Sequence, residues 1–341
     1  MTLKIDVFNH IFPRPFFERL QQVVVNRGAI KRWLHIPFLY DLDVRLRMLE
    51  EFGDAYRQVL SLSAPPIESI NPDPQITLDL ARLANDTQAE LVRRYPGRFP
   101  GFIASLPLND PDASVVELER AVTQLDALGV QIFSNVNGLP LDDERFFPLF
   151  EAAHRLQRPV LLHPARGAKF ADYPGEVKSK YEIWWTFGWP YETSAAMQRL
   201  VFSRLFDRLP GIRIVAHHLG AMVPYFEGRV GFGLDQLGAR TADEDYEALR
   251  RSLPRRPIDY FKMFWADTAV FGSRAATVCG LSFFGTEQVV FASDAPFDPE
   301  GGPMYIRETI RVIDGLDISE ADRRRIYQTN AECLFGRTFE P

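Results

Sequence analysis

Short apolar runs alternate with longer amphipathic stretches along most of the chain. The runs are rich in Val, Ile, Leu and Phe, and they do not alternate cleanly between apolar and polar residues. Strands that are buried on both faces of a parallel sheet have this pattern. We therefore expect eight strands, in the segments 4–10, 56–63, 99–108, 129–136, 158–164, 211–218, 264–269 and 289–297.

Stretches of helical length with one apolar face lie between several of these runs. The clearest are 76–95, 112–128, 143–156 and 192–209. Gly129 and Gly211 follow two of them, where a C-terminal cap is expected. Eight strands that alternate with helices predict a (β/α)₈ TIM barrel, an α/β fold, with residues 1–341 as one domain. A doubly wound open sheet is the alternative, although no G-x-G-x-x-G follows the first run.

Two connecting segments are too long for simple loops. Residues 11–55 follow the first expected strand, and residues 165–191 follow the fifth. In a barrel, both insertions would leave the C-terminal ends of strands, where active sites lie. The second insertion leads into YEIWWTFGWPYE at 181–192, which either packs at a subunit interface or also covers a pocket.

Composition and charge argue against some classes of partner and location. The 341 residues carry a formal net charge of −6 and leave no basic footprint for nucleic acid or an anionic membrane. No apolar run approaches the roughly 18 residues of a membrane span, and no signal peptide is apparent. The two cysteines, Cys279 and Cys333, lack metal-like spacing, which favours a reducing compartment. We expect a cytoplasmic protein.

Polar side chains suited to a metal cation follow four of the expected strands. They are His10, His163, the pair His217 and His218, and Asp294. Imidazole nitrogen and carboxylate oxygen are the usual ligands of zinc and also suit manganese or iron. Because the chain has only six histidines and only His35 and His154 lie elsewhere, we expect these strand ends to share one functional site.

An ordered set of motifs strengthens this interpretation. It includes IDVFNHIFP, GVQIFSNVNG, LLHP, HHLGAMVPYFEGRV and ASDAPF. Through them almost the whole chain resembles the decarboxylase-type branch of the amidohydrolase superfamily, typified by aminocarboxymuconate-semialdehyde decarboxylase. The resemblance implies a (β/α)₈ barrel with one divalent metal, often zinc and sometimes manganese. It also implies loss of CO₂ without oxidation, although other members of the branch hydrate or hydrolyse their substrates.

The resemblance also implies roles for particular residues. His10, His163 and Asp294 correspond to metal ligands, and Asp294 is also expected to take part in catalysis. His218 corresponds to the catalytic histidine because Arg229 follows it by eleven residues. Arg229 corresponds to an arginine that holds the substrate carboxylate, in some members across a subunit interface. We therefore expect a homodimer.

Position 8 departs from the family pattern. The family has His or Glu there, whereas Phe8 cannot bind a metal. Three ligands plus water still make an open catalytic site, but weaker binding, a different metal or no metal at all stay open. His217 has no counterpart in the type enzyme. A structural role is the favoured interpretation for it, and replacement of the missing ligand stays open.

The function favoured by these residues is decarboxylation of a small aromatic or unsaturated carboxylic acid. Trp184, Trp185 and Trp189 are expected to form apolar walls for the substrate. Arg32 or Arg47 is a candidate for a second cationic contact. A metal-dependent hydrolase or hydratase that acts on a lactone, amide or ring is the first alternative. A metal-free binding protein is the second, and Phe8 is the observation in its favour.

Overall fold

The computed structural model describes residues 2–340, without the side chain of Ala29. Eight strands form one sheet in the order β1-β2-β3-β4-β7-β8-β9-β10, and the paired neighbours in this order are parallel. These strands are β1 (Lys4–His10), β2 (Tyr56–Ser61), β3 (Gly101–Ser105), β4 (Gly129–Phe133), β7 (Val160–His163), β8 (Ile214–Ala216), β9 (Trp265–Asp267) and β10 (Val289–Val290).

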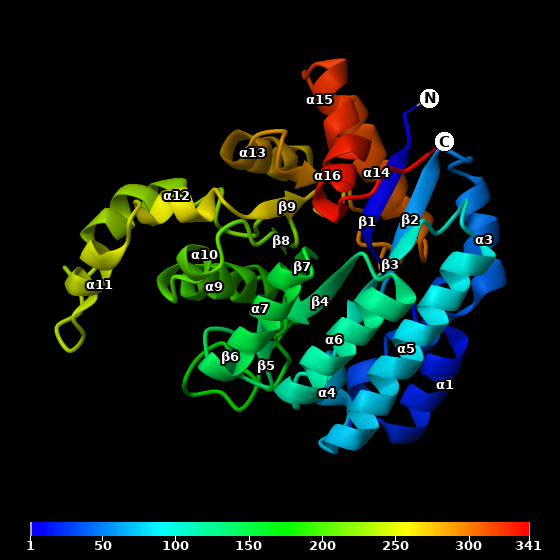
Figure 1. The fold of residues 1–341 in the computed structure, drawn as a ribbon, viewed down its shortest axis with the longest axis horizontal. Coiled ribbons are helices and arrows are strands. Elements are labelled where there is room, and N and C mark those ends of the chain that lie inside the picture. The colour runs from blue at the N-terminus through cyan, green and yellow to red at the C-terminus, as the bar shows by residue number, and fades with distance from the viewer. Residues whose placement is uncertain (1, 341) are drawn as a thin grey trace.

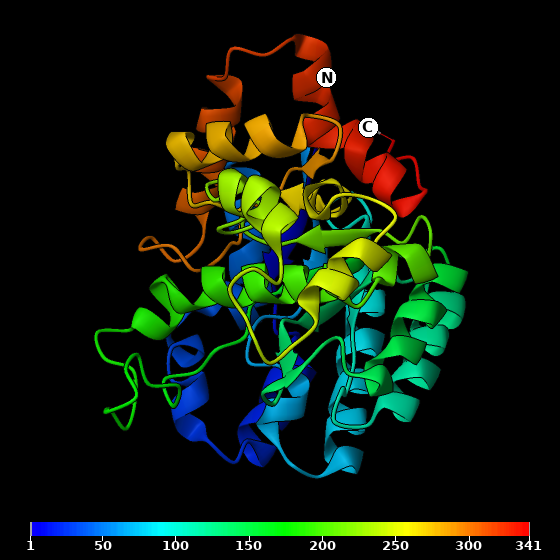
Figure 2. The same ribbon diagram turned by 90° about the vertical axis from the view of Figure 1, so that its left-hand side faces the viewer.

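The last strand returns to the first and closes the sheet. The backbone amide of Val7 donates to the carbonyl of Phe291 at 2.9 Å, and the amide of Asp294 donates to the carbonyl of Phe8 at 3.0 Å. Helices surround the strands in both views (Figures 1 and 2). The predicted (β/α)₈ barrel is therefore confirmed, and each expected strand segment contains one barrel strand.

Sixteen α-helices lie within residues 2–340. They are α1 (Arg14–Val23), α2 (Pro37–Tyr40), α3 (Leu42–Glu50), α4 (Ile67–Ile70), α5 (Pro74–Arg94), α6 (Pro111–Leu125), α7 (Phe147–Arg155), α8 (Ile183–Thr186), α9 (Gly188–Phe202), α10 (Leu205–Arg208), α11 (Tyr246–Ser252), α12 (Pro257–Phe261), α13 (Arg274–Phe284), α14 (Pro303–Asp314), α15 (Glu320–Arg324) and α16 (Asn330–Phe335).

Shorter elements complete the chain. A two-stranded antiparallel hairpin consists of β5 (Asn135–Val136) and β6 (Leu139–Pro140). The single-turn and irregular helical segments are η1 (Arg27–Ile30), η2 (Trp33–His35), η3 (Glu144–Phe146), η4 (Arg229–Gly233), η5 (Leu234–Gln236) and η6 (Arg325–Thr329). Within the described part of the chain, no helix has the length and apolar character needed to cross a membrane.

The long helices begin where the sequence provides both a cap and a proline. The Asp73 carboxylate accepts from the backbone amide of Gln75 at the start of α5, and Asp110 accepts from Ala113 at the start of α6. Each Asp is followed by a proline at the first helical position, where the missing N–H is not needed. These helices pack on each other outside β3, as Figure 1 shows.

The segments after β1 and β7 lie next to the C-terminal ends of the strands. The first holds α1, α2 and α3. The buried rings of Phe16 and Phe17 on α1 pack with that of Phe12, which precedes the helix. The second is mostly irregular before it enters α8 and α9. Both segments therefore border the rim where the polar strand ends meet.

Candidate active site

Four buried side chains converge at the C-terminal ends of the barrel strands. His10 ends β1, His163 ends β7, His217 follows β8 and Asp294 follows β10. Each offers one donor atom, and the four atoms lie within 4.8 Å of one another. All four residues are at least 95% buried, and His10 has no exposed surface. The arrangement is a His₃Asp site for one metal ion.

Hydrogen bonds to the Nδ1 atoms orient the three imidazoles. His10 Nδ1 donates to the carbonyl of Leu62 at 2.9 Å, and His163 Nδ1 donates to the carbonyl of Pro164 at 2.8 Å. His217 Nδ1 donates to Asp267. Because each acceptor holds a proton on Nδ1, Nε2 is the atom that each ring turns to the centre of the cluster, and it can bind a metal ion once it carries no proton.

The donor chemistry of the cluster fits a cation. His10 Nε2 lies 3.0 Å from Asp294 Oδ1, so a lone pair faces a carboxylate oxygen unless a proton or a metal ion lies between them. His217 Nε2 is 3.5 Å from the same oxygen and is buried without a hydrogen-bond partner among residues 2–340. Imidazole nitrogen and carboxylate oxygen are both ligand atoms that zinc accepts.

The charges within the cluster depend on one another. Burial alone would lower the pKa of His217, but Asp267 and then Asp294 raise it to about 9. Burial, followed by repulsion from His217 and His10, holds the pKa of His163 well below its usual value. Burial opposes ionisation of Asp294, yet the neighbouring imidazoles of His10 and then His217 hold its pKa well below the ordinary value. The cluster therefore retains an anionic carboxylate.

Phe8 lies among the ligating side chains although it cannot bind a metal. Its ring centroid is 4.0 Å from that of His217, 5.3 Å from that of His10 and 5.8 Å from that of His163. Position 8 therefore faces the cluster, as the family pattern implies. The phenyl ring packs edge-on against His217 and leaves that imidazole as a fourth donor.

His218 adjoins the cluster without being one of its four donors. Its ring stacks on that of His217 with the centroids 3.8 Å apart, and its Nδ1 donates to the carbonyl of Ala269 at 2.7 Å. Burial and then repulsion from His217 lower the pKa of His218 to about 4. The neutral ring therefore keeps a lone pair on Nε2 for proton exchange.

The backbone at the site is strained in two places. His218 has a φ of 57° and Asp294 a φ of 62°, in the left-handed region that side chains other than glycine rarely adopt. Such conformations cost about 1–3 kcal/mol each and gather at functional sites, where the surrounding structure enforces them. Here they turn the chain sharply at the end of β8 and after β10.

A buried arginine fixes the end of β1, and the sequence interpretation did not identify it. Arg45 on α3 donates from Nη1 to the carbonyl of His10 at 2.6 Å and from Nη2 to Asn9 Oδ1 at 2.5 Å. Its Nε donates to Gln58 at 2.9 Å. Arg45 therefore positions a ligand-bearing strand. A charged residue in an amphipathic helix usually faces solvent, so the sequence carried no signal for this role.

The three predicted aromatic wall residues differ in how near they lie to the cluster. Trp189 is the tryptophan in contact with the cluster, with its ring centroid 5.6 Å from that of His163. Trp184 packs on Trp189 at 5.7 Å, and Trp185 lies 6.5 Å from Trp189. Trp184 and Trp185 thus line the region outside Trp189, and neither ring contacts a residue of the cluster among residues 2–340.

The candidate substrate-binding arginines lie in three different segments, and no hydrogen bond or ion pair joins any of them directly to the cluster among residues 2–340. Arg229 is exposed at the start of η4 and lies over the ring of Phe226 at 5.4 Å. Arg32 lies 5.2 Å from the ring of Phe297, which itself is 5.4 Å from the ring of His10. Arg47 is exposed on α3. Among these three, Arg32 is linked to the cluster through one intervening side chain.

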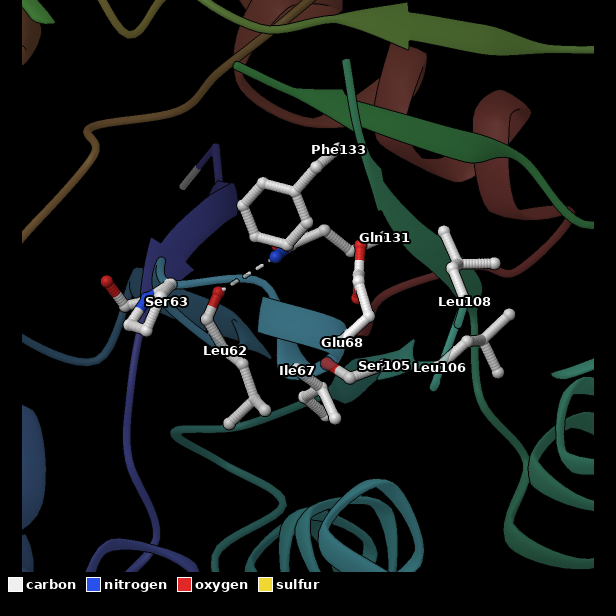
Figure 3. A pocket seen from close by; sticks show the side chains of 10 residues that line it. Leu62, Ser63, Ile67, Glu68, Ser105, Leu106, Leu108, Gln131 and Phe133 are labelled. Atoms are coloured by element: carbon white, nitrogen blue, oxygen red, sulfur yellow. Dashed lines mark hydrogen bonds between the residues drawn. The ribbon is translucent and has the colours of Figure 1, made fainter. Parts of the chain in front are cut away.

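A cavity adjoins the cluster on the side of β2, β3 and β4 (Figure 3). The carbonyl of Leu62 accepts from His10 Nδ1 and also from Gln131 Nε2, at 3.1 Å. Phe133 lines the same cavity, and its ring centroid is 5.0 Å from that of His163. The cavity and the His₃Asp cluster therefore share a wall.

Comparison with known proteins agrees with this geometry. Residues 71–337 match the family described as Amidohydrolase. The chain belongs to the amidohydrolase family. It is 35% identical over 303 residues to gamma-resorcylate decarboxylase of Rhodococcus jostii, with 86% of this chain and 87% of the relative covered.

Two further relatives place this amidohydrolase among decarboxylases. It is 34% identical to 2-amino-3-carboxymuconate-6-semialdehyde decarboxylase of Dictyostelium discoideum, over 98% of this chain and 92% of the relative. A crystal structure of dihydroxybenzoic acid decarboxylase from Polaromonas sp. JS666, with bound manganese and 2-nitroresorcinol, superposes with a TM-score of 0.77. That pair is 27% identical, and 98% and 97% of the two chains are covered. The predicted resemblance is confirmed.

Proposed function

We propose that this amidohydrolase is a metal-dependent carboxy-lyase that removes CO₂, without oxidation, from a small aromatic or unsaturated carboxylic acid. The observation that carries the proposal is the buried His₃Asp cluster with the neutral imidazole of His218 beside it. The decarboxylases to which the chain is similar support the reaction type. Gamma-resorcylate and carboxymuconate semialdehyde, in the names of those relatives, indicate the substrate class.

The metal would be held by His10, His163, His217 and Asp294, because these are the donors that the fold brings together. When bound, a divalent ion supplies fixed positive charge for the substrate carboxylate and a neighbouring oxygen. Zinc suits the nitrogen-rich ligand set, and the manganese of the Polaromonas structure makes manganese the alternative. His217 thus extends the ligand set expected from the sequence.

His218 is the proposed proton carrier. When the bond between the ring carbon and the carboxylate breaks, its electron pair stays on that carbon and CO₂ leaves. The carbon then takes up a proton, which the neutral His218 would first accept at Nε2 from water and then deliver, because Nδ1 is committed to the carbonyl of Ala269. Asp294, which contacts both His10 and His217, keeps negative charge next to the reacting group.

Trp189 supplies the inner apolar wall, and Trp184 and Trp185 extend it outward. We further propose that Arg229 binds the substrate carboxylate across the interface of a homodimer, since Arg229 is exposed and the family resemblance implies this role. A cytoplasmic location also stays a prediction from the sequence.

A substrate panel tests the proposed function. Purified protein loaded with zinc or manganese is assayed for CO₂ release from hydroxybenzoates and muconate-type acids, and for hydrolysis of lactones and amides. We expect CO₂ release from at least one acid and loss of that activity after chelation of the metal. Turnover of lactones or amides alone would contradict the decarboxylase and favour hydrolysis by the same barrel.

A further inference from the structure

Three polar side chains lining the cavity beside the cluster have atoms without a hydrogen-bond partner among residues 2–340. These atoms are Glu68 Oε1, Ser105 Oγ and Gln131 Oε1. The three residues are 3–5% exposed, so bulk water does not satisfy them. An unsatisfied buried polar group costs about 1–3 kcal/mol. Three around one cavity indicate a polar group that binds there.

The three side chains come from separate elements that meet near the barrel mouth. Glu68 lies on α4, Ser105 ends β3 and Gln131 lies within β4. Figure 3 shows them grouped with Phe133, and the bond from Gln131 Nε2 to the carbonyl of Leu62 is drawn there. That bond commits the amide nitrogen of Gln131, so its oxygen is the atom left for a ligand.

The chemistry of the cavity matches a neutral hydroxyl. Ser105 Oγ can donate a hydrogen bond, whereas the free Gln131 oxygen can only accept one. Burial raises the pKa of Glu68 to about 8, so its carboxyl is protonated at neutral pH and can also donate. A hydroxyl is both donor and acceptor and satisfies this set. A second carboxylate does not, because it cannot donate to the Gln131 oxygen.

The size and position of the cavity restrict the ligand further. The cavity has room for about one water-sized group. It shares the Leu62 carbonyl with the ligand His10, and it shares Phe133 with the surroundings of His163. The cavity is therefore next to the place where a ring held at the cluster would lie, separated from it by Leu62 and Phe133, and a single small substituent is all that it could receive.

We propose that Glu68, Ser105 and Gln131 form a subsite that binds a hydroxyl substituent of the aromatic acid and selects hydroxylated acids. This inference rests on the proposed function, because it takes the ring to be held at the His₃Asp cluster. The same hydrogen-bonding chemistry would also hold one buried water molecule. The experiment must therefore distinguish a substrate hydroxyl from water.

The test is a calorimetric comparison of binding by the metal-loaded protein. The ligands are 2-hydroxybenzoate and the isomeric dihydroxybenzoates, which differ from it by one hydroxyl. We expect at least one isomer to bind wild type about tenfold or more tightly than 2-hydroxybenzoate, because the hydroxyl satisfies otherwise unpaired groups. Ser105→Ala and Glu68→Leu should each reduce that preference severalfold.

Two further variants serve as matched controls. Ser114 is a fully buried serine on α6 whose Oγ also has no partner among residues 2–340, but it does not line the cavity. Ser114→Ala should keep the full preference. Glu68→Gln, which still donates and accepts, should keep most of it, and this result would separate lost hydrogen bonding from lost packing.

The possible results distinguish failure of the proposed hydroxyl subsite from failure of the proposed decarboxylation. An unchanged preference in both Ser105→Ala and Glu68→Leu, or no preference in wild type, overturns the subsite and leaves the cavity to a water molecule. Absence of binding by all of these acids overturns it as well. Selective binding without CO₂ release from any acid would instead contradict the proposed decarboxylation and leave the subsite standing.

Discussion

The ends of β1 and β8 differ in how they serve the same cluster. β1 presents Phe8 and His10 to it, so one of the two positions that bear ligands in the family contributes an apolar ring. β8 is followed by two histidines, and His217 adds the donor that β1 lacks. We propose that the donor missing at position 8 of β1 is supplied by the histidine after β8 instead.

The two regions also differ in how their side chains are supported. The end of β1 is held through its backbone and Asn9 by the buried Arg45. The imidazole of His217 is held directly by the carboxylate of Asp267, which also accepts from the backbone amide of His218. A ligand with its own carboxylate partner is both oriented and made more basic. We therefore expect the two histidines that follow β8 to contribute more to metal affinity and catalysis than the residues of β1 do.

The largest expected effect separates the two histidines that follow β8. His218→Ala should lower kcat by about 10²–10⁴-fold, because it removes the proposed proton carrier. Metal content, measured by mass spectrometry of the purified variant, should stay at the wild-type level. Loss of the metal together with activity would show that His218, and not only His217, is a ligand.

The second prediction tests whether His217, after β8, replaces the metal ligand that is missing at Phe8 on β1. His217→Ala should weaken metal binding by at least about a hundredfold, since a direct ligand matters at least as much as the groups around it. Phe8→Ala is the matched control, because it removes a buried ring from the same cluster without removing a donor. Metal affinities are measured by competition with a chelating dye. Equal affinities of the two variants would contradict the claim that His217 replaces the missing ligand.

Asp267→Asn tests whether the carboxylate that accepts from His217 Nδ1 strengthens metal binding by that histidine. The amide can still accept from Nδ1 but has lost its charge, so metal affinity should fall by about 10–100-fold. Titration of the metal-free variant, with its melting temperature as a check on folding, measures this effect. Wild-type affinity in a folded variant would mean that orientation by packing is sufficient and that the carboxylate is not needed.

The smallest predicted effect concerns Asp6, a buried residue of β1, and the pH dependence of the free energy of unfolding. Burial raises the pKa of Asp6 to about 6, although hydrogen bonds from Ser293 and Tyr56 oppose the rise. The native state then binds more protons than the unfolded state between about pH 4 and 6, so the free energy of unfolding falls as pH rises through that window. Asp6→Asn should remove about 1–2 kcal/mol of this pH dependence.

Urea unfolding of wild type and Asp6→Asn at several pH values measures that difference. Only the change in slope is informative, because the substitution also alters the hydrogen bonds to Tyr56 and Ser293 at every pH. Parallel profiles for the two proteins would mean that Asp6 is ionised throughout this window and that β1 buries a charge.

The sequence was sufficient to predict the barrel and much of the cluster. Parallel strands bring their C-terminal ends to one rim, so the placement of His10, His163 and Asp294 after apolar runs was enough to bring them together. Arg45 was not predictable in this way, because its burial depends on how α3 packs against β1.

The role of His218 was predicted from the family resemblance, whereas the strand pattern could not place His217 in the cluster, for a local reason. A strand that continued through 218 would point successive side chains to opposite faces. β8 instead ends at Ala216, and left-handed conformations at His218 and Leu219 turn the chain. Both rings consequently stack at the rim, and alternation no longer indicates which one faces the cluster.

The most direct test of the account is a crystal structure of the zinc-loaded protein with anomalous scattering recorded at the zinc edge. The account predicts one zinc peak, with His217 Nε2 at about 2.0–2.1 Å from it together with His10, His163 and Asp294. A zinc ion bound by those three residues, with His217 too far away to be a ligand, would contradict the replacement of the ligand lost at Phe8.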